Sequence, residues 1–189
     1  LRSIDRGSSM TLPITNPSVV EVSSDRRRAL VGSAAGRRGA ITRLEMRGRR
    51  WSTRGPAIIQ RGLMNSCISG DGRWIGMVAG RASRRSFDGG ARVTAGPRIA
   101  TGMCSVDALG MTLSFTTVWL TDLVAARYDA DGREVWRHTL GAMRLLSGSG
   151  SPHVIAQSSD GNVVALDAVS GRELFSHSVD GEPFVATDG

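Results

Sequence analysis

Short apolar runs alternate with turns rich in glycine, aspartate and serine along most of the chain. Near the C-terminal end, an apolar run at 163–166 lies between turns at 158–162 and 168–171, and a second run follows at 172–177. Runs of about four to eight residues with β-branched and aromatic side chains, bounded by turn residues, are typical of β-strands. The pattern therefore predicts an all-β protein of short antiparallel strands.

The strand pattern also repeats. Arg-Glu-Val-Trp-Arg-His at 133–138 recurs 39 residues later as Arg-Glu-Leu-Phe-Ser-His at 172–177, so that Trp136 corresponds to Phe175. A weaker copy ends in Trp51, and aspartate turns recur at 25, 71 and 107. Four short strands per repeat of about 40 residues indicate a β-propeller of four-stranded antiparallel blades, about four in number. A fragment of a larger propeller would have the same pattern.

We expect an N-terminal extension at 1–17 and propeller repeats at 18–189, with blades near 18–54, 64–95, 100–140 and 142–179 and a starter strand at 183–186. The secondary structure of two segments is not decided by the pattern. The stretch 83–94 is rich in arginine and glycine and is expected to hold a loop. The stretch 118–126 fits a short helix as well as a strand, and the threonine and aromatic content of 112–121 favours the strand.

The last repeat resembles the pyrroloquinoline-quinone-type propeller repeat, and the aspartate-glycine turns of the earlier repeats resemble WD-type repeats. The matching positions of the quinone-type motif are Ala165, Asp167, Ser170, Gly171, Arg172 and Phe175. The resemblance implies that Asp167 and Gly171 shape a tight turn and that Trp51, Trp136 and Phe175 pack between blades. It covers about half of the chain well and most of the rest loosely.

Enzymes of that family use adjacent cysteines, a calcium site of Glu, Asn and Asp, and a catalytic Asp. Cys67 and Cys104 are 37 residues apart and no such acid cluster is visible, so we expect no catalytic residue, metal or cofactor. The two cysteines are interpreted as small buried residues, and a single disulfide between neighbouring strands stays open. His138, His153 and His177 have no ligand spacing, which makes a metal or acid–base role a weak alternative.

Charge adds one candidate site. All 24 basic residues are arginine, and residues 1–98 carry a net charge of +13 against −6 for residues 99–189. We expect Arg37, Arg38, Arg81, Arg84 and Arg85 to lie in the loops between second and third strands of two consecutive blades, where they would form one patch that binds an anion or a partner. An ordinary solvated basic surface would have the same composition.

The sequence thus favours a non-enzymatic propeller scaffold or sensor domain that binds a protein or peptide partner. Anion or nucleic-acid binding through the arginine-rich face is the second hypothesis. A quinone-dependent dehydrogenase-like domain is the third, and it rests on the family resemblance alone. No apolar run approaches the ~18 residues that span a bilayer, and the compartment stays undetermined.

Overall fold

The computed structural model describes residues 17–35, 38–117, 122–147 and 150–178, and within these ranges it contains strands and turns but no helix. The strands form four antiparallel sheets in chain order. The expected all-β fold class with four-stranded antiparallel sheets is confirmed. Residues 1–16 and the starter strand expected at 183–186 lie outside the described residues.

The first sheet contains β1 (Pro17–Val22), β2 (Arg28–Ala35), β3 (Arg38–Arg47), β4 (Arg50–Thr53) and β5 (Ile58–Arg61). The second contains β6 (Asn65–Ile68), β7 (Trp74–Val78), β8 (Ala82–Ser86) and β9 (Val93–Ala95). The third contains β10 (Ile99–Val106), β11 (Gly110–Thr117), β12 (Val124–Asp129) and β13 (Glu134–Thr139). The fourth contains β14 (Met143–Leu145), β15 (His153–Ser158), β16 (Asn162–Asp167) and β17 (Glu173–Ser178).

The first sheet has a fifth strand that the repeat pattern does not predict. Its long strand β3 pairs with β4 over residues 44–47 and with β5 over residues 38–41. Because β4 satisfies the backbone groups of only one half of β3, the other half is free to pair with the segment that follows. The connection between the first two sheets therefore contributes a strand.

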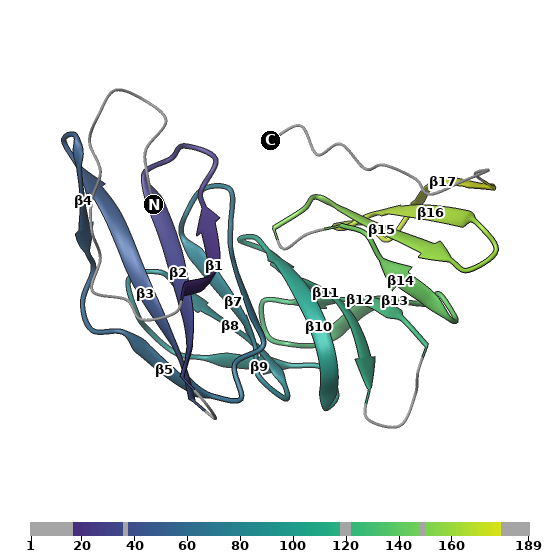
Figure 1. Ribbon diagram of the computed structural model, residues 1–189, viewed down its shortest axis with the longest axis horizontal. Helices are drawn as coiled ribbons and strands as arrows, with labels where there is room; N and C mark the ends of the chain where they lie inside the picture. The colour runs from purple at the N-terminus through teal and green to yellow at the C-terminus, as the bar shows by residue number, and fades with distance from the viewer. Residues whose placement is uncertain (1–16, 36–37, 118–121, 148–149, 179–189) are drawn as a thin grey trace.

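The four sheets follow one another in an arc, with the N-terminal sheet at the left and the C-terminal sheet at the right of Figure 1. The first strands of the first three sheets lie close together, since β1 and β10 both contact β6. Apolar side chains fill the spaces between successive sheets rather than one central core. One cluster lies between the first and second sheets, one between the second and third, and one between the third and fourth.

The loop expected over 83–94 is shorter than predicted, because β8 takes up Ala82–Ser86 and β9 takes up Val93–Ala95. In β8 the side chains of Ser83 and Arg84 are buried although the segment has a polar sequence. The stretch 118–126 ends in β12, which begins at Val124, while residues 118–121 lie outside the described part.

Candidate functional site

The outer strand of the third sheet docks on a turn of the fourth. Trp136, on β13, donates a hydrogen bond from Nε1 to the carbonyl oxygen of Val169, at 3.0 Å. Gly171 has a φ of +72°, and a Cβ at this position would lie 2.6 Å from the indole ring of Trp136. Only a glycine fits both the turn and the ring that covers it.

Asp167 shapes that turn. Its Oδ1 accepts hydrogen bonds from the backbone N–H groups of Val169, at 3.1 Å, and Ser170, at 2.7 Å. The hydrogen bonds from Ser170 are the main reason why the pKa of Asp167 lies below its ordinary value. Asp167 therefore fixes the surface on which Trp136 packs.

The fourth sheet repeats the pattern, and within the described residues no further sheet follows it. Phe175, on β17, occupies the position of Trp136 but is 49% exposed, and its neighbour Leu174 is 41% exposed. Every side chain of β17 is exposed. Trp51, at the corresponding place in the first sheet, is half-buried against a cluster of Ala29, Val31 and Leu44. The last strand of the fourth sheet thus exposes two apolar side chains, Leu174 and Phe175, among polar ones.

The arginines expected to form one patch differ in their surroundings in the structure. Arg38 begins β3 and Arg81 lies in the turn before β8, and both are exposed. Arg37 lies outside the described residues. Arg84 and Arg85 lie within β8, so the prediction that they belong to a loop is wrong. Because neighbouring side chains of a strand point to opposite faces, these two arginines also face different sheets.

Arg84 spans the interface between the second and third sheets. Its guanidinium stacks 3.6 Å above the ring of Trp74 and donates hydrogen bonds to the carbonyl oxygens of Asp107 and Ala108. These contacts satisfy a buried cation with a ring and backbone oxygens. Anion binding by Arg84 remains a prediction, and it would require these contacts to be released.

Buried arginines recur at one position of the first three sheets, which sequence reasoning missed. In each of these sheets, the arginine pairs across strands with the residue five places after the turn aspartate. The pairs are Leu30 with Arg43, Gly76 with Arg84 and Thr112 with Arg127. Arg127, in the third sheet, donates to both carboxylate oxygens of Asp107 at 2.8 Å and to Thr112. The three residues are Arg43, Arg84 and Arg127. Their contacts show that part of the arginine content stabilises the fold instead of facing solvent.

The fold resembles solved structures that share little sequence with this chain. The WD40 domain of Toxoplasma gondii coronin matches with a TM-score of 0.61 and 9% identity, over 87% of this chain and 46% of that one. The β-propeller domain of Cps50 (Swd1) from Myceliophteria thermophila matches with a TM-score of 0.58 and 11% identity, over 92% and 58% of the two chains. The chain is built of β-propeller blades.

A third match is hydrazine synthase from Kuenenia stuttgartiensis, with a TM-score of 0.55 and 13% identity, over 94% of this chain and 53% of that one. This chain therefore spans about half the length of the propellers it matches. These similarities support the expected β-propeller fold, and at such low identity they show the fold alone. The sequence matches no protein-family model, and no curated protein shows significant similarity to it.

A disulfide between Cys67 and Cys104 joins the innermost strands of the second and third blades, β6 and β10. The preferred interpretation of two unpaired buried thiols is therefore wrong, and the alternative of one disulfide is correct. Gly76 lies beneath the bond, since a Cβ there would be 2.4 Å from the Cys67 sulfur. The sequence hides the pairing because the two cysteines belong to different repeats.

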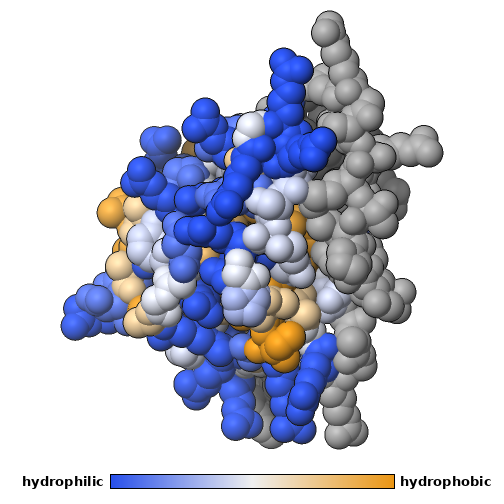
Figure 2. Space-filling model, turned by 90° about the vertical axis from the view of Figure 1, so that its left-hand side faces the viewer, coloured by the Kyte–Doolittle hydropathy of each residue, from blue (hydrophilic) through white to orange (hydrophobic). Residues whose placement is uncertain are grey.

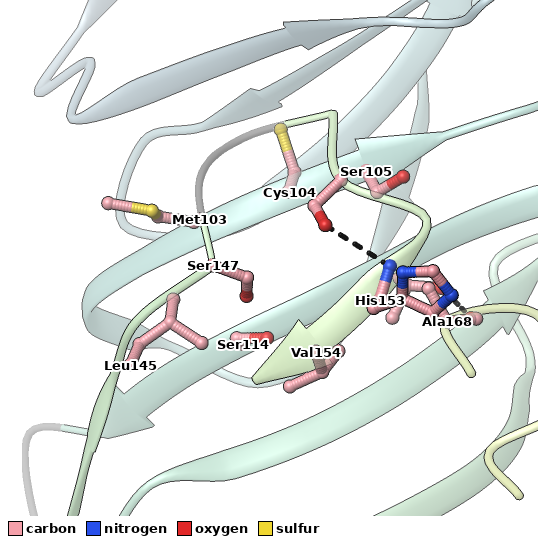
Figure 3. Close-up of a pocket in the computed structure, with 11 residues that line it drawn as sticks. Met103, Cys104, Ser105, Ser114, Leu145, Ser147, His153, Val154 and Ala168 are labelled. Carbon is pink, nitrogen blue, oxygen red and sulfur yellow. Dashed lines mark hydrogen bonds between the residues drawn. The ribbon is translucent and has the colours of Figure 1, made fainter. Parts of the chain in front are cut away.

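A pocket opens between the third and fourth blades (Figure 3). It is lined by the hydroxyl side chains Ser105, Thr112, Ser114, Ser147 and Ser151, together with His153 and apolar residues. His138 and His177 lie apart from it, on the exposed strands β13 and β17. Among the described residues, no group of three or more His, Cys, Asp or Glu side chains is arranged to hold a metal ion, and no helix is long and apolar enough to cross a membrane.

Proposed function

We propose that this chain is a non-enzymatic β-propeller scaffold that binds a protein partner through the outer face of its fourth blade. The observation that carries the proposal is the contrast between Trp136, which the next blade covers, and Phe175, which is 49% exposed at the same position. Exposed aromatic side chains on a flat, preformed surface are frequent centres of protein interfaces.

The blade offers two kinds of contact to a partner. Leu174 and Phe175 supply apolar area, and full burial of a side chain of this size is worth about 1.5–3 kcal/mol. Strand β17 is also the last in its sheet, so within the described residues its outer backbone groups have no strand to pair with. Such an edge can accept a further strand from a partner.

The covered blade indicates what the partner surface looks like. Trp136 rests on a turn that presents Gly171 and the carbonyl oxygen of Val169. We expect the partner to present a β-sheet surface with a small residue opposite Phe175, because the aromatic ring then meets a flat surface without a protruding side chain. The fold similarity to WD40 domains supports a scaffold role in general terms.

The test compares two exposed apolar residues on equivalent outer strands. Val135, on β13, is 59% exposed and serves as the matched control for Phe175. The wild-type chain, Phe175→Ser and Val135→Ser are purified with their bound proteins from the cells that make the protein, and each candidate partner is then tested for direct binding in purified form. The proposal requires a partner that binds the wild type and Val135→Ser directly but binds Phe175→Ser at least tenfold more weakly. Equal binding to all three chains, or turnover of a substrate without any protein partner, would overturn it.

A further inference from the structure

Four arginines lie where the first and second blades face each other: Arg28 and Arg54 share the Asp88 carboxylate, and the positive charge of Arg85 acts on Arg43. They form the arginine cluster, which contains Arg28 of β2, Arg43 of β3, Arg54 after β4 and Arg85 of β8. The nearby carboxylates are Asp88 and Glu45, each of which forms an ion pair with Arg28. The cluster therefore keeps an excess of two positive charges. Figure 2 shows that the molecular face formed by the first blade is largely hydrophilic.

Arg43 is the most buried member, with 8% of its surface exposed. Its Nη1 donates to the carbonyl oxygen of Phe87 at 2.5 Å and its Nη2 to that of Pro56 at 3.4 Å, whereas its Nε has no hydrogen-bond partner. The buried Nε of Arg85 lacks a partner as well. Within the described part of the chain, neither side chain forms an ion pair with a carboxylate. Buried charge without a counter-ion is costly.

Electrostatics agree with this geometry. Burial is the main cause that lowers the pKa of Arg43, and the positive charges of Arg85 and Arg54 lower it further against the opposing effect of Asp88. Arg85 points toward the first blade because its neighbour Arg84 points toward the third. An arginine keeps its charge at neutral pH, so a bound anion would reduce the repulsion between these side chains.

Asp88 neutralises the positive charge of the arginine cluster only weakly. Its carboxylate oxygens lie 3.3 Å from Arg28 Nη2 and 3.3 Å from Arg54 Nε, and its side chain is 45% exposed. By comparison, Arg127 reaches both oxygens of Asp107 at 2.8 Å. Charge-assisted hydrogen bonds in good geometry are about 2.7–2.9 Å long, so Asp88 is a weakly held counter-ion at the mouth of the cluster.

We propose that the arginine cluster binds a phosphate group, which takes the place of the Asp88 carboxylate between Arg28 and Arg54 and interacts with the nearby positive charges of Arg43 and Arg85. A phosphate dianion carries more charge than a carboxylate and accepts hydrogen bonds from several directions, which suits guanidinium groups that converge from different strands. The group is either free inorganic phosphate or the phosphorylated side chain of a peptide. The site shares only Arg85 with the arginine patch expected from the sequence.

Isothermal titration with inorganic phosphate, at ionic strength held constant with chloride, tests the proposal. We expect saturable binding that Arg85→Gln weakens at least tenfold and Asp88→Asn tightens severalfold, because the competing carboxylate is gone. Asp131→Asn is the matched control, since it makes the same change of charge at a side chain that is 72% exposed in another blade. It should bind phosphate as the wild type does. If Arg85→Gln fails to fold, as circular dichroism will show, Arg54→Gln replaces it.

A second pair of titrations identifies the source of the phosphate. The probes are the capped peptide Gly-Gly-phosphoserine-Gly-Gly and its unphosphorylated form. Tighter binding of the phosphopeptide than of inorganic phosphate assigns the site to phosphorylated proteins, and the reverse order assigns it to the free anion. The proposal is overturned if neither phosphate nor phosphopeptide binds above the chloride baseline. It is equally overturned if Asp131→Asn tightens binding as much as Asp88→Asn, since the effect would then be one of net charge.

Discussion

The third and fourth blades share a strand pattern, yet they are held in different ways. The third blade is fixed on both sides, by the Cys67–Cys104 disulfide toward the second blade and by Trp136 toward the fourth. Within the described residues, the outer strand of the fourth blade has no neighbouring blade, and Leu174 and Phe175 on it are exposed. Repeats with the same sequence motif can therefore serve packing in one place and binding in another, depending on what lies next to them.

Loss of the disulfide, which holds the third blade, is expected to lower the free energy of unfolding more than any other change. It closes a loop of 37 residues, and the loss of loop-closure entropy in the unfolded chain predicts a stabilisation of about 4 kcal/mol. Denaturant unfolding of the double variant Cys67→Ala and Cys104→Ala should show this loss. A reducing agent should destabilise the wild type by a similar amount and leave the double variant unchanged, and a loss below about 1 kcal/mol would contradict the assigned role.

Removing the two equivalent aromatic rings compares the covered and open faces directly. Trp136→Ala should lower the free energy of unfolding by about 3 kcal/mol, since it leaves a gap over Gly171 and an unpaired carbonyl at Val169. Phe175→Ala should cost about 0.5 kcal/mol, because the ring is half exposed in the isolated chain. Chemical denaturation measures both. Equal losses would mean that the two faces do not differ in packing.

A pH-dependent effect of intermediate size concerns the contact of the fourth blade with the first. Glu21 of β1 lies near Gly150, where a Cβ would be 3.4 Å from its carboxylate, and burial raises the pKa of Glu21 to about 7. Between pH 4.5 and 7 the folded chain keeps the Glu21 proton, whereas the unfolded chain has released it. The contribution of Glu21 to the free energy of unfolding is therefore fully present below pH 4.5 and is lost as the pH rises through 7.

After allowance for solvent screening, this loss should be about 1–2 kcal/mol. Denaturant unfolding between pH 4.5 and 8 measures it. Glu21→Gln should remove the slope, and Glu173→Gln, at an exposed site on β17, should keep it. A slope that persists in Glu21→Gln would assign the pH dependence to other groups.

The sequence repeat carries enough information to predict the fold. The candidate site, in contrast, depends on contacts that the repeat does not encode. The Arg-Glu-apolar-aromatic pattern and the aspartate turns indicate propeller blades because they report local strand and turn geometry. The buried arginines escape notice because Arg43, Arg84 and Arg127 lie at different distances along the chain from their turn aspartates. The loops between second and third strands differ in length, so equivalence appears only in the strand register.

The disulfide and the arginine cluster were hidden for a related reason. Cys67 pairs with Cys104, and Arg43 meets Arg85, across blade boundaries that no local pattern describes. The polar sequence of 82–86 indicates a solvated loop, yet these residues form strand β8 because neighbouring blades supply carbonyl oxygens and an aromatic ring to Arg84. Contacts between repeats, unlike the repeats themselves, require the three-dimensional arrangement.

Site-specific photocrosslinking tests most directly whether the open face of the fourth blade binds a protein. Benzoylphenylalanine replaces Phe175 in one chain and Val135 in another, and each chain is irradiated in the cells that make the protein. We expect a covalent adduct with a protein partner from position 175 and none from position 135, although position 135, on the third blade, is the more exposed of the two. No adduct from position 175, or the same adducts from both positions, would contradict it.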